Sequence, residues 1–367
     1  MKLAVLGGSN GAFATAADMA LAGHRVRLWR RSQADVDPLI GGITLTAEQR
    51  QGKAQLDRVT ADLAAALEGA DVVIAPVPAT AHEDLAKRLA PHLADRQIVL
   101  LTPGTLGSYA LARTIARAGG TLPYAFAETG TLPYLCRKTG PAAVAAPVRA
   151  ANLPVGVFPA SRGPAVLARI AELFPSARPC ADALDVALTN AGAVIHPPLV
   201  LVNAGAIDGG RFDIHAAGTT ASARTLIDAV DAERLAARRG WGYGPPHYEL
   251  ATYYEEARAA EGLYGAGAKQ KLVASGLWSE VVTFEHRYVT EDVVLGLSLF
   301  ESAARTVGSP SQAISGLLGV FGALLGFPLS GRGRALEALG LGDFALREIR
   351  ALLDEGWAGP LWLKVLR

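Results

Sequence analysis

Short apolar runs alternate with longer amphipathic stretches in the first half of the chain. The runs have the length of strands buried on both faces, and they cover residues 2–6, 25–29, 70–78, 96–104 and 122–129. Between them lie stretches with helical spacing, such as AHEDLAKRLAPHLA. Strands that alternate with helices predict a doubly wound parallel sheet, because each helix crosses one face before the next strand pairs. Ligands then bind at the carboxyl ends of the strands.

After about residue 180 the pattern becomes helical. Long stretches with helical spacing include ADALDVALTNAGAVI, ASARTLIDAVDAERLAARRG, TYYEEARAAEGLYGAGAKQKLVASG and VVLGLSLFESAARTVG. A chain of 367 residues exceeds the size of one ordinary core. We therefore expect an α/β plus all-α protein, with a Rossmann-type sheet domain over 1–182 and an all-helical domain over 183–367.

Composition excludes several classes of protein. Half of the residues are hydrophobic and the formal net charge is +1, so neither disorder nor nucleic-acid binding is expected. The apolar stretch 313–327 is shorter than the ~20 residues that cross a bilayer, so no membrane is expected. This stretch fits a core helix or the interface of a homodimer. Cys136 and Cys180 form no zinc or disulfide pattern, which indicates a reducing, cytoplasmic compartment and no metal.

A glycine turn follows the first strand. It reads as G-x-G-x-x-G/A over Gly7, Ser9 and Ala12, with Asn10 and Gly11 keeping the turn permissive. Between a strand and a helix, such a turn predicts a dinucleotide with its pyrophosphate at the helix N-terminus. Ser9 departs from the motif: its Cβ crowds the pyrophosphate, although its hydroxyl could donate to a phosphate oxygen. The alternative is a tight turn without a ligand.

Arg30, Arg31 and Ser32 follow the second strand, where NAD-specific folds place an acid against the ribose. A guanidinium there would contact a 2′-phosphate, a bond worth ~1.5–3 kcal/mol. The sequence therefore predicts a preference for NADP, with NAD as the second option. A solvated basic loop is the alternative.

A second dinucleotide pattern is weaker. The spacing G-x-x-G-x-x-A over Gly8, Gly11 and Ala14, with Tyr134 and Lys138, resembles short-chain dehydrogenases and their catalytically silent, NADPH-sensing relatives. That family needs the tyrosine and lysine on one face of a long helix. Pro133 and the TGP that follows Lys138 argue against such a helix.

His196 stands before two prolines in an apolar helical stretch. Because Pro197 and Pro198 cannot donate backbone hydrogen bonds, we expect the helix to break or kink there and His196 to face a cavity. An imidazole can exchange a proton near neutral pH. The alternative is a histidine that caps a kinked helix.

Arg287 and Asp292 lie at the expected start of a helix, with Thr290 as a candidate N-cap. An arginine can bind a substrate carboxylate with two parallel bonds, and an aspartate can hold an imidazole in one tautomer. At this spacing such a pair is more often a surface ion pair.

Together these segments resemble the octopine/nopaline (opine) dehydrogenase family, whose helical domain is distantly similar to those of 6-phosphogluconate and glycerol-3-phosphate dehydrogenases. The resemblance runs through VLGGSNGAFA, LLTPGTLGS, ETGTLPYLCR, NAGAVIHPPLVLVNAG, HRYVTEDVVLGL and GRALEALGL. It implies a catalytic histidine at His196, its partner aspartate at Asp292 and a carboxylate-binding arginine at Arg287. It further implies an amino-acid site with Glu128, Cys136 and Arg137, and a nicotinamide site with Pro78, Thr102, Pro103 and Gly104.

The resemblance also implies a reaction. The amine of an L-amino acid condenses with a 2-oxo acid such as pyruvate, and NAD(P)H reduces the imine. Two other functions stay open: a C=O reductase of the glycerol-3-phosphate or ketopantoate type, for which Lys269 is the candidate lysine, and a silent NADPH sensor. The amino acid itself is undetermined, since Glu128 favours a cationic side chain whereas Tyr243, Tyr253, Tyr254 and Trp278 favour an apolar one.

Overall fold

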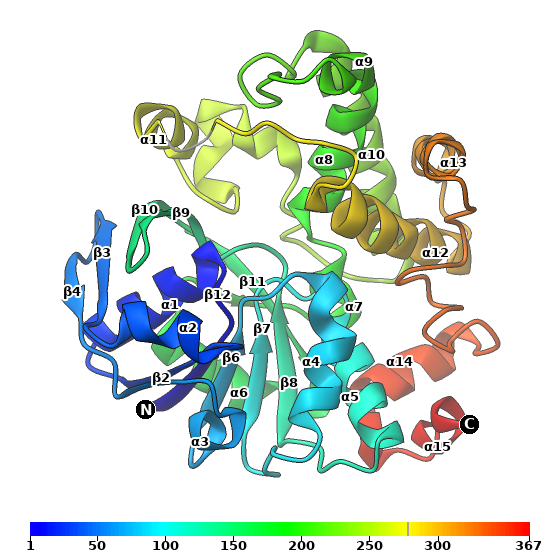
Figure 1. Cartoon of the computed structure of the whole chain (residues 1–367). Coiled ribbons are helices and arrows are strands. Elements are labelled where there is room, and N and C mark those ends of the chain that lie inside the picture. Colours follow the sequence, from blue (N-terminus) through cyan, green and yellow to red (C-terminus); the bar gives the residue numbers. More distant parts are fainter. Residues whose placement is uncertain (277–278) are drawn as a thin grey trace.

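An eight-stranded sheet forms the centre of the first half, which confirms the predicted fold (Figure 1). The computed structural model describes residues 1–276 and 279–367. Neighbouring strands are parallel except for β8 and β11. In spatial order the strands are β12 (Ala177–Pro179), β11 (Leu153–Phe158), β8 (Ala125–Thr129), β7 (Ile98–Leu101), β6 (Val72–Ala75), β1 (Lys2–Leu6), β2 (Arg25–Trp29) and β5 (Arg58–Thr60).

The chain reverses direction across the sheet between β1 and β6. From β1 it proceeds to β2 on one side, and it returns to β6 on the other. The carboxyl ends of these two strands lead into Gly7 and Pro76, so the glycine turn lies at the switch point where such sheets bind ligands.

Helices cover both faces of this sheet. The α1 (Asn10–Leu21) and α6 (Gly163–Leu173) helices share a buried core with one face. The α3 (Leu63–Leu67), α4 (His82–Leu89) and α5 (Gly107–Arg117) helices pack on the other face. The short α2 helix (Gln33–Val36) follows β2.

A second, four-stranded sheet was not predicted. Its order is β4 (Gly52–Ala54), β3 (Ile43–Ala47), β10 (Ala143–Arg149) and β9 (Tyr134–Gly140), and it packs against α1. Tyr134 and Lys138 therefore lie on a strand, as the argument against a long helix here required. The Tyr134 hydroxyl donates to Asp18 and the Lys138 ammonium to the Gly8 carbonyl, so the two side chains do not form a catalytic pair.

The second half is helical (Figure 1). Its helices are α7 (Ala183–Ala187), α8 (Ala191–Val202), α9 (Ala204–Asp208), α10 (Ala221–Gly240), α11 (Ala268–Ala274), the π-helix η6 (Tyr288–Leu297), α12 (Ser298–Thr306) and α13 (Gln312–Leu325). The stretch predicted as one helix over 252–276 instead contains 3₁₀ turns and only the short α11. Ala183–Val202 is long and apolar enough to cross a membrane by length and composition, but it contains the two helices α7 and α8, and most of its apolar window is buried inside the protein.

The predicted break at the prolines is wrong, because α8 continues through Pro197 and Pro198. Proline has a φ angle that suits a helix, although each interior proline costs one backbone hydrogen bond and crowds the carbonyl of the residue four positions earlier. Burial of both prolines and of Leu199 and Val200 in the core keeps the helix intact.

The end of the chain returns to the first half. The α14 (Leu346–Glu355) and α15 (Trp362–Leu366) helices contact α5 and the turn before α6 (Figure 1). Trp357 and Trp362 make ring contacts with Phe158, and Trp362 also with Tyr109. The domain boundary at residue 182 stays a prediction. The α14 and α15 helices lie after it in the sequence but pack against the sheet domain.

Candidate active site

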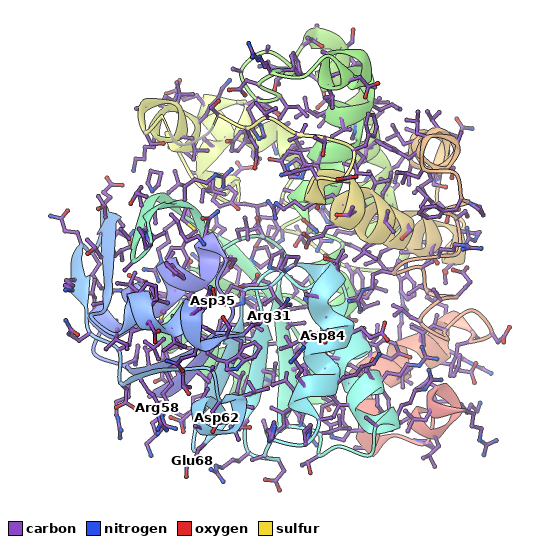
Figure 2. All side chains as sticks on the ribbon, in the orientation of Figure 1. Arg31, Asp35, Arg58, Asp62, Glu68 and Asp84 are labelled. Atoms are coloured by element: carbon purple, nitrogen blue, oxygen red, sulfur yellow. The ribbon has the colours of Figure 1, made fainter. Side chains whose placement is uncertain are left out.

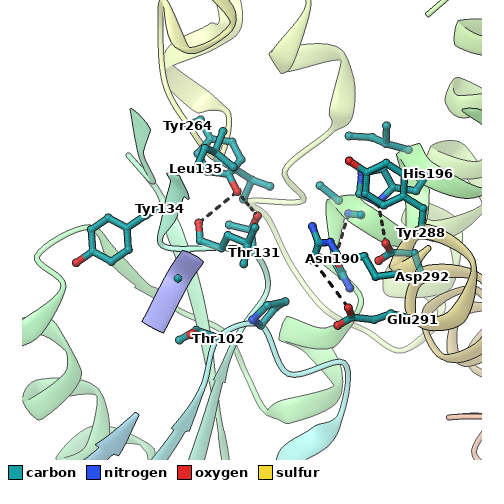
Figure 3. Close-up of a pocket in the computed structure, with 18 of the residues that line it drawn as sticks. Thr102, Thr131, Tyr134, Leu135, Asn190, His196, Tyr264, Tyr288, Glu291 and Asp292 are labelled. Atoms are coloured by element: carbon teal, nitrogen blue, oxygen red, sulfur yellow. Dashed lines mark hydrogen bonds and ion pairs between the residues drawn. The ribbon is translucent and has the colours of Figure 1, made fainter. Parts of the chain in front are cut away.

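A cavity of about 370 Å³ lies between the two halves (Figure 3). The first half contributes the glycine turn and the ends of β6, β7 and β9 to its lining. The second half contributes α8, the loop over 248–264 and the start of η6. His196, Arg287 and Asp292 all line this cavity, so the structure brings the three predicted catalytic residues together.

His196 and Asp292 are in direct contact. The Nδ1 atom of His196 lies 2.7 Å from Oδ2 of Asp292, and the imidazole stacks on the Tyr288 ring at a centroid distance of 3.5 Å. Burial lowers the pKa of His196 below its usual value, while Asp292 opposes this and favours the charged ring. Because Asp292 holds Nδ1, a proton exchanged with a substrate passes through Nε2.

The π-helical form of η6 explains how Arg287 and Asp292 share a face. Residues five apart are about 140° apart around an α-helix, at 100° per residue. In a π-helix the hydrogen bonds run from i to i+5, so such residues lie near one face. Thr290 was predicted to cap this helix, but the helix begins at Tyr288 and the Thr290 hydroxyl donates to the His286 carbonyl. The capping prediction is therefore wrong.

Two glycines let α8 and η6 approach closely. A Cβ atom on Gly296 would lie 2.6 Å from the Cβ of Ala193, and one on Gly192 would lie 2.7 Å from Oδ1 of Asp292. These spacings leave no room for a side chain. The contact between His196 and Asp292 therefore depends on glycine at both positions.

A polar cluster around Glu280 was missed by sequence reasoning. The Tyr288 hydroxyl donates to Glu280 at 2.6 Å, and Arg137, His215 and His286 lie 3.3–3.5 Å from its carboxylate. Burial favours the neutral acid, but hydrogen bonds from His215, His286 and Tyr288 outweigh it and hold the pKa of Glu280 far below its usual range. Separate segments supply these residues, so no local motif reveals the cluster.

Two of the three residues predicted for the amino-acid site line the cavity. Cys136 and Arg137 line the cavity, and burial raises the pKa of the Cys136 thiol to about 12. Glu128 does not line it: the side chain is fully buried and accepts hydrogen bonds from the backbone N–H groups of Leu106 and Ser108 at 2.7 Å. The prediction for Glu128 is wrong, because this carboxylate is used at the start of α5.

The glycine turn fits a dinucleotide. Ser9 lies between the large cavity and a second one of about 190 Å³, which Gly7 and Gly8 line. A Cβ on Gly8 would overlap the guanidinium group of Arg30, so a larger residue here would have to displace that side chain. The Ser9 hydroxyl donates to the Pro76 carbonyl at 2.6 Å and accepts from the Ala12 N–H, as the N-cap of α1. The expectation that it donates to a phosphate is therefore wrong.

Arg30 and Arg31 line the smaller cavity, but both face acids. Arg30 lies 3.1 Å from Asp35, and the exposed Arg31 lies 4.0 Å from Asp84 (Figure 2). Ser32 does not line the cavity, because its hydroxyl caps α2 by accepting from the Asp35 N–H. The prediction for Ser32 is wrong for this reason.

The remaining predicted cofactor residues divide into two groups. Asn10, Gly11, Pro78, Thr102 and Pro103 line the large cavity, and the buried Thr102 hydroxyl has no hydrogen-bond partner within the described part of the chain. Ala12 and Gly104 lie off it. Ala12 is buried against the sheet, and a Cβ on Gly104 would lie 2.3 Å from the side chain of Glu128. These two positions serve packing, which corrects their assignment to the cofactor.

Lys138 is a further cation at the glycine turn. Its ammonium donates to the Gly8 carbonyl at 3.1 Å, and its backbone N–H donates to Asn10. Both Lys138 and Arg30 lie over the Phe13 ring. The sequence signal was present in YLCRK, but it was considered there only as a helical pair.

The residues of the alternative functions lie elsewhere. Lys269 is exposed on α11 and does not line the cavity. Of the aromatic side chains, Tyr253 lines the cavity, Tyr243 donates to Asp182 in the core, and Trp278 lies outside the described residues. Within residues 1–276 and 279–367, no group of three or more His, Cys, Asp and Glu side chains is placed to hold a metal.

Comparisons with known proteins identify relatives of both halves. The model of the alpha-helical domain of NAD/NADP octopine/nopaline dehydrogenase matches residues 179–325, and that of the NAD-dependent glycerol-3-phosphate dehydrogenase N-terminus matches residues 2–112. An opine dehydrogenase of Arthrobacter sp. (strain 1C) is 29% identical over 360 residues, covering 96% of this chain and 98% of its own.

Solved structures support the fold. Octopine dehydrogenase in complex with NADH and agmatine has a TM-score of 0.73 at 20% identity, covering 96% of this chain and 98% of its own. Yersinopine dehydrogenase with NADP⁺ bound has a TM-score of 0.64 at 14% identity, covering 97% of this chain and 98% of its own. Family models match both halves, and a relative spans nearly the whole length, so the chain is similar throughout to opine dehydrogenases.

Proposed function

We propose that this protein is an opine dehydrogenase that joins the amino group of an L-amino acid to a 2-oxo acid such as pyruvate. The product is a secondary amine that carries two carboxylates, and the reverse reaction is its oxidation. The observation that carries the proposal is the His196–Asp292 pair, 2.7 Å apart, beside Arg287 in a cavity that the glycine turn also lines. A bound nicotinamide cofactor supplies or accepts the hydride.

The side chains fit the steps of condensation. Arg287 binds the carboxylate of the 2-oxo acid and so fixes the position of its C2 carbon. Protonated His196 donates its Nε2 proton to the oxo oxygen as the amine attacks, and it then recovers a proton from the nitrogen of the adduct. It donates this proton to the hydroxyl, which leaves as water when the protonated imine forms. Asp292 stabilises the charged imidazole. In the oxidative direction, neutral His196 takes the proton back.

The amino acid would bind on the opposite wall of the cavity. Arg137, on β9, is a second cation there and suits the α-carboxylate, while Cys136 and Tyr253 offer an apolar surface to the side chain. Glu128 is removed from the site by its burial. We therefore propose an apolar rather than a cationic amino acid.

We further propose that NADP is preferred over NAD. Arg30 and Lys138 both lie at the glycine turn and would bind phosphate oxygens. Asp35 is the counter-charge that a 2′-phosphate would have to displace from Arg30. The test compares KM for NADPH and for NADH in wild type and in Arg30→Ala. The variant should lose the preference for NADPH, and an unchanged ratio of the two KM values would exclude a role of Arg30 in this preference.

Assembly and location are also proposals. The α13 helix exposes Val320 and Leu324, which are 47% and 52% exposed, and such apolar side chains suit the interface of a homodimer. Cys136 and Cys180 are free thiols, which fits the reducing cytoplasm.

The function is tested by mixing the protein with NADPH, pyruvate and single amino acids. Loss of nicotinamide absorbance, with a product whose mass equals amino acid plus pyruvate minus one oxygen atom, is the expected result. Reduction of pyruvate alone would favour the C=O reductase. NADPH binding without turnover of any mixture would favour the silent sensor.

A further inference from the structure

Glu291 is a buried carboxyl group that the proposed mechanism does not use. It lies next to Asp292 on η6 and lines the cavity, with only 4% of its surface exposed. Its Oε1 atom accepts a hydrogen bond from the Ala79 N–H, on the loop after β6, at 2.9 Å. Its Oε2 atom has no hydrogen-bond partner among the described residues. Glu291 therefore connects the two halves and leaves one buried oxygen atom unsatisfied.

The unsatisfied oxygen faces the proposed substrate anchor. Oε2 of Glu291 lies 3.8 Å from a guanidinium nitrogen of Arg287, an ion-pair distance but not a hydrogen bond. A substrate carboxylate on Arg287 would bring a second anion to the same guanidinium. Two carboxylates that share one cation in a buried site disfavour double ionisation.

Other charged groups around Glu291 relieve this repulsion only in part. Asp292 adds a negative charge on η6 itself, and His196 on α8 is held by Asp292. Arg334, from the segment before α14, is buried and donates to the Ala79 carbonyl and to His82 on α4. Arg334 is attracted most strongly by Glu128 and more weakly by Glu291, so it offsets only part of the negative charge at Glu291.

With a substrate carboxylate bound, the charges around Arg287 balance only when Glu291 is neutral. Arg287 and a protonated His196 carry two positive charges, and Asp292 and one substrate carboxylate carry two negative charges. An ionised Glu291 would add a third negative charge without a partner, which is costly in a buried position. Protonation of Glu291 restores neutrality.

We propose that Glu291 is a positioning residue that takes up a proton when a substrate carboxylate binds to Arg287, leaving this guanidinium to the substrate alone. The proposal rests on the proposed function, because it requires Arg287 to bind a carboxylate. Burial, with Asp292 second, raises the pKa of Glu291 to about 7 in the free protein, so near neutral pH either state is accessible.

The affinity for pyruvate should therefore fall as the pH rises. Above its pKa, free Glu291 is ionised and must be protonated before pyruvate binds tightly. One such group weakens binding about tenfold between pH 6 and pH 8. Glu291→Gln keeps an oxygen for the Ala79 N–H and mimics the neutral acid. We expect its pyruvate Kd to rise about tenfold less than that of wild type over this range.

The experiment is calorimetry of pyruvate binding to the NADPH-loaded protein at pH 8, in buffers with different ionisation enthalpies. Wild type should take up about one more proton per pyruvate than Glu291→Gln does. Glu301→Gln is the matched control, because Glu301 is also buried, pairs with an arginine four residues away and does not line the cavity. It should behave as wild type.

Equal proton uptake by wild type and Glu291→Gln would overturn the proposal and leave the function intact. Absence of pyruvate binding by wild type would overturn both. If Glu291→Gln does not fold, infrared spectra of wild type decide: pyruvate at pH 8 should add a protonated-carboxyl band, and its absence would overturn the proposal.

Discussion

At the scale of single residues, the proposed function depends on the pKa of the His196 imidazole, on which two groups of interactions act in opposite directions. Burial lowers the pKa of His196, and Asp292 raises it. Condensation needs the protonated ring as an acid, whereas oxidation needs the neutral ring as a base. The reductive reaction should therefore decline as pH rises, and the oxidative reaction should increase.

Replacement of Asp292 by Asn tests this balance. Without the carboxylate the pKa of His196 falls further. The decline of reductive kcat/KM with rising pH therefore begins at a lower pH. The loss of one charge-assisted bond should lower reductive kcat/KM at pH 7 by about 10- to 100-fold. Profiles of kcat/KM against pH in both directions check it, and an unshifted reductive limb would contradict the role of Asp292.

Single residues also show where sequence reasoning ends. His196, Arg287 and Asp292 were identified because each occurs in a distinctive local pattern that resembles a known family. Glu128 was placed wrongly, and the hydrogen bond of the Ser9 hydroxyl was not foreseen, because their partners are backbone groups: the N–H groups at the start of α5 and the Pro76 carbonyl. Hydrogen bonds of this kind leave no trace in residue spacing.

At the scale of elements, the site depends on the close packing of α8 and η6. The sequence predicted both helical segments, but not that α8 passes through two prolines or that η6 is a π-helix. These outcomes depend on tertiary burial, which overrides local propensity. The Arg287–Asp292 spacing was informative only through family resemblance, because an α-helix would separate the two side chains.

Gly296→Ala tests this packing. The new Cβ would lie 2.6 Å from Ala193, so the two helices must move apart. We expect a loss of about 1–3 kcal/mol in the free energy of unfolding. We also expect a fall in kcat of more than about tenfold, as the His196–Asp292 contact widens.

Urea unfolding and steady-state kinetics measure the two effects. Gly316→Ala on α13 is the control, because among the described residues its added Cβ would meet no atom within 4 Å beyond its own helix backbone. This variant should be unchanged or more stable, by up to about 1 kcal/mol. Wild-type kcat in Gly296→Ala would show that the close approach is dispensable.

At the scale of the whole molecule, the chain encloses the cavity between its halves and then returns to the sheet. The alternation of strands and helices predicted the parallel sheet, and the later helical pattern predicted the second half. The small sheet of β3, β4, β9 and β10 and the return of α14 and α15 were not predicted. Both depend on contacts between distant segments, about which local periodicity carries no information.

Trp362→Ala tests the return of the chain. Trp362 is 4% exposed and contacts Tyr109 and Phe158 against the sheet. We expect a loss of about 3–5 kcal/mol in the free energy of unfolding, measured in urea. Retained NADPH affinity of the folded fraction would show that the site is intact. A loss below about 1 kcal/mol would mean that α15 is not part of the core.

The most direct test of the account is a comparison of wild type with His196→Ala. With NADPH, pyruvate and the best amino acid, we expect kcat for the secondary-amine product to fall at least ~10²-fold while the Kd for NADPH stays unchanged. Product formation by His196→Ala at the wild-type rate would contradict the assignment of His196 as the acid and, with it, the mechanism.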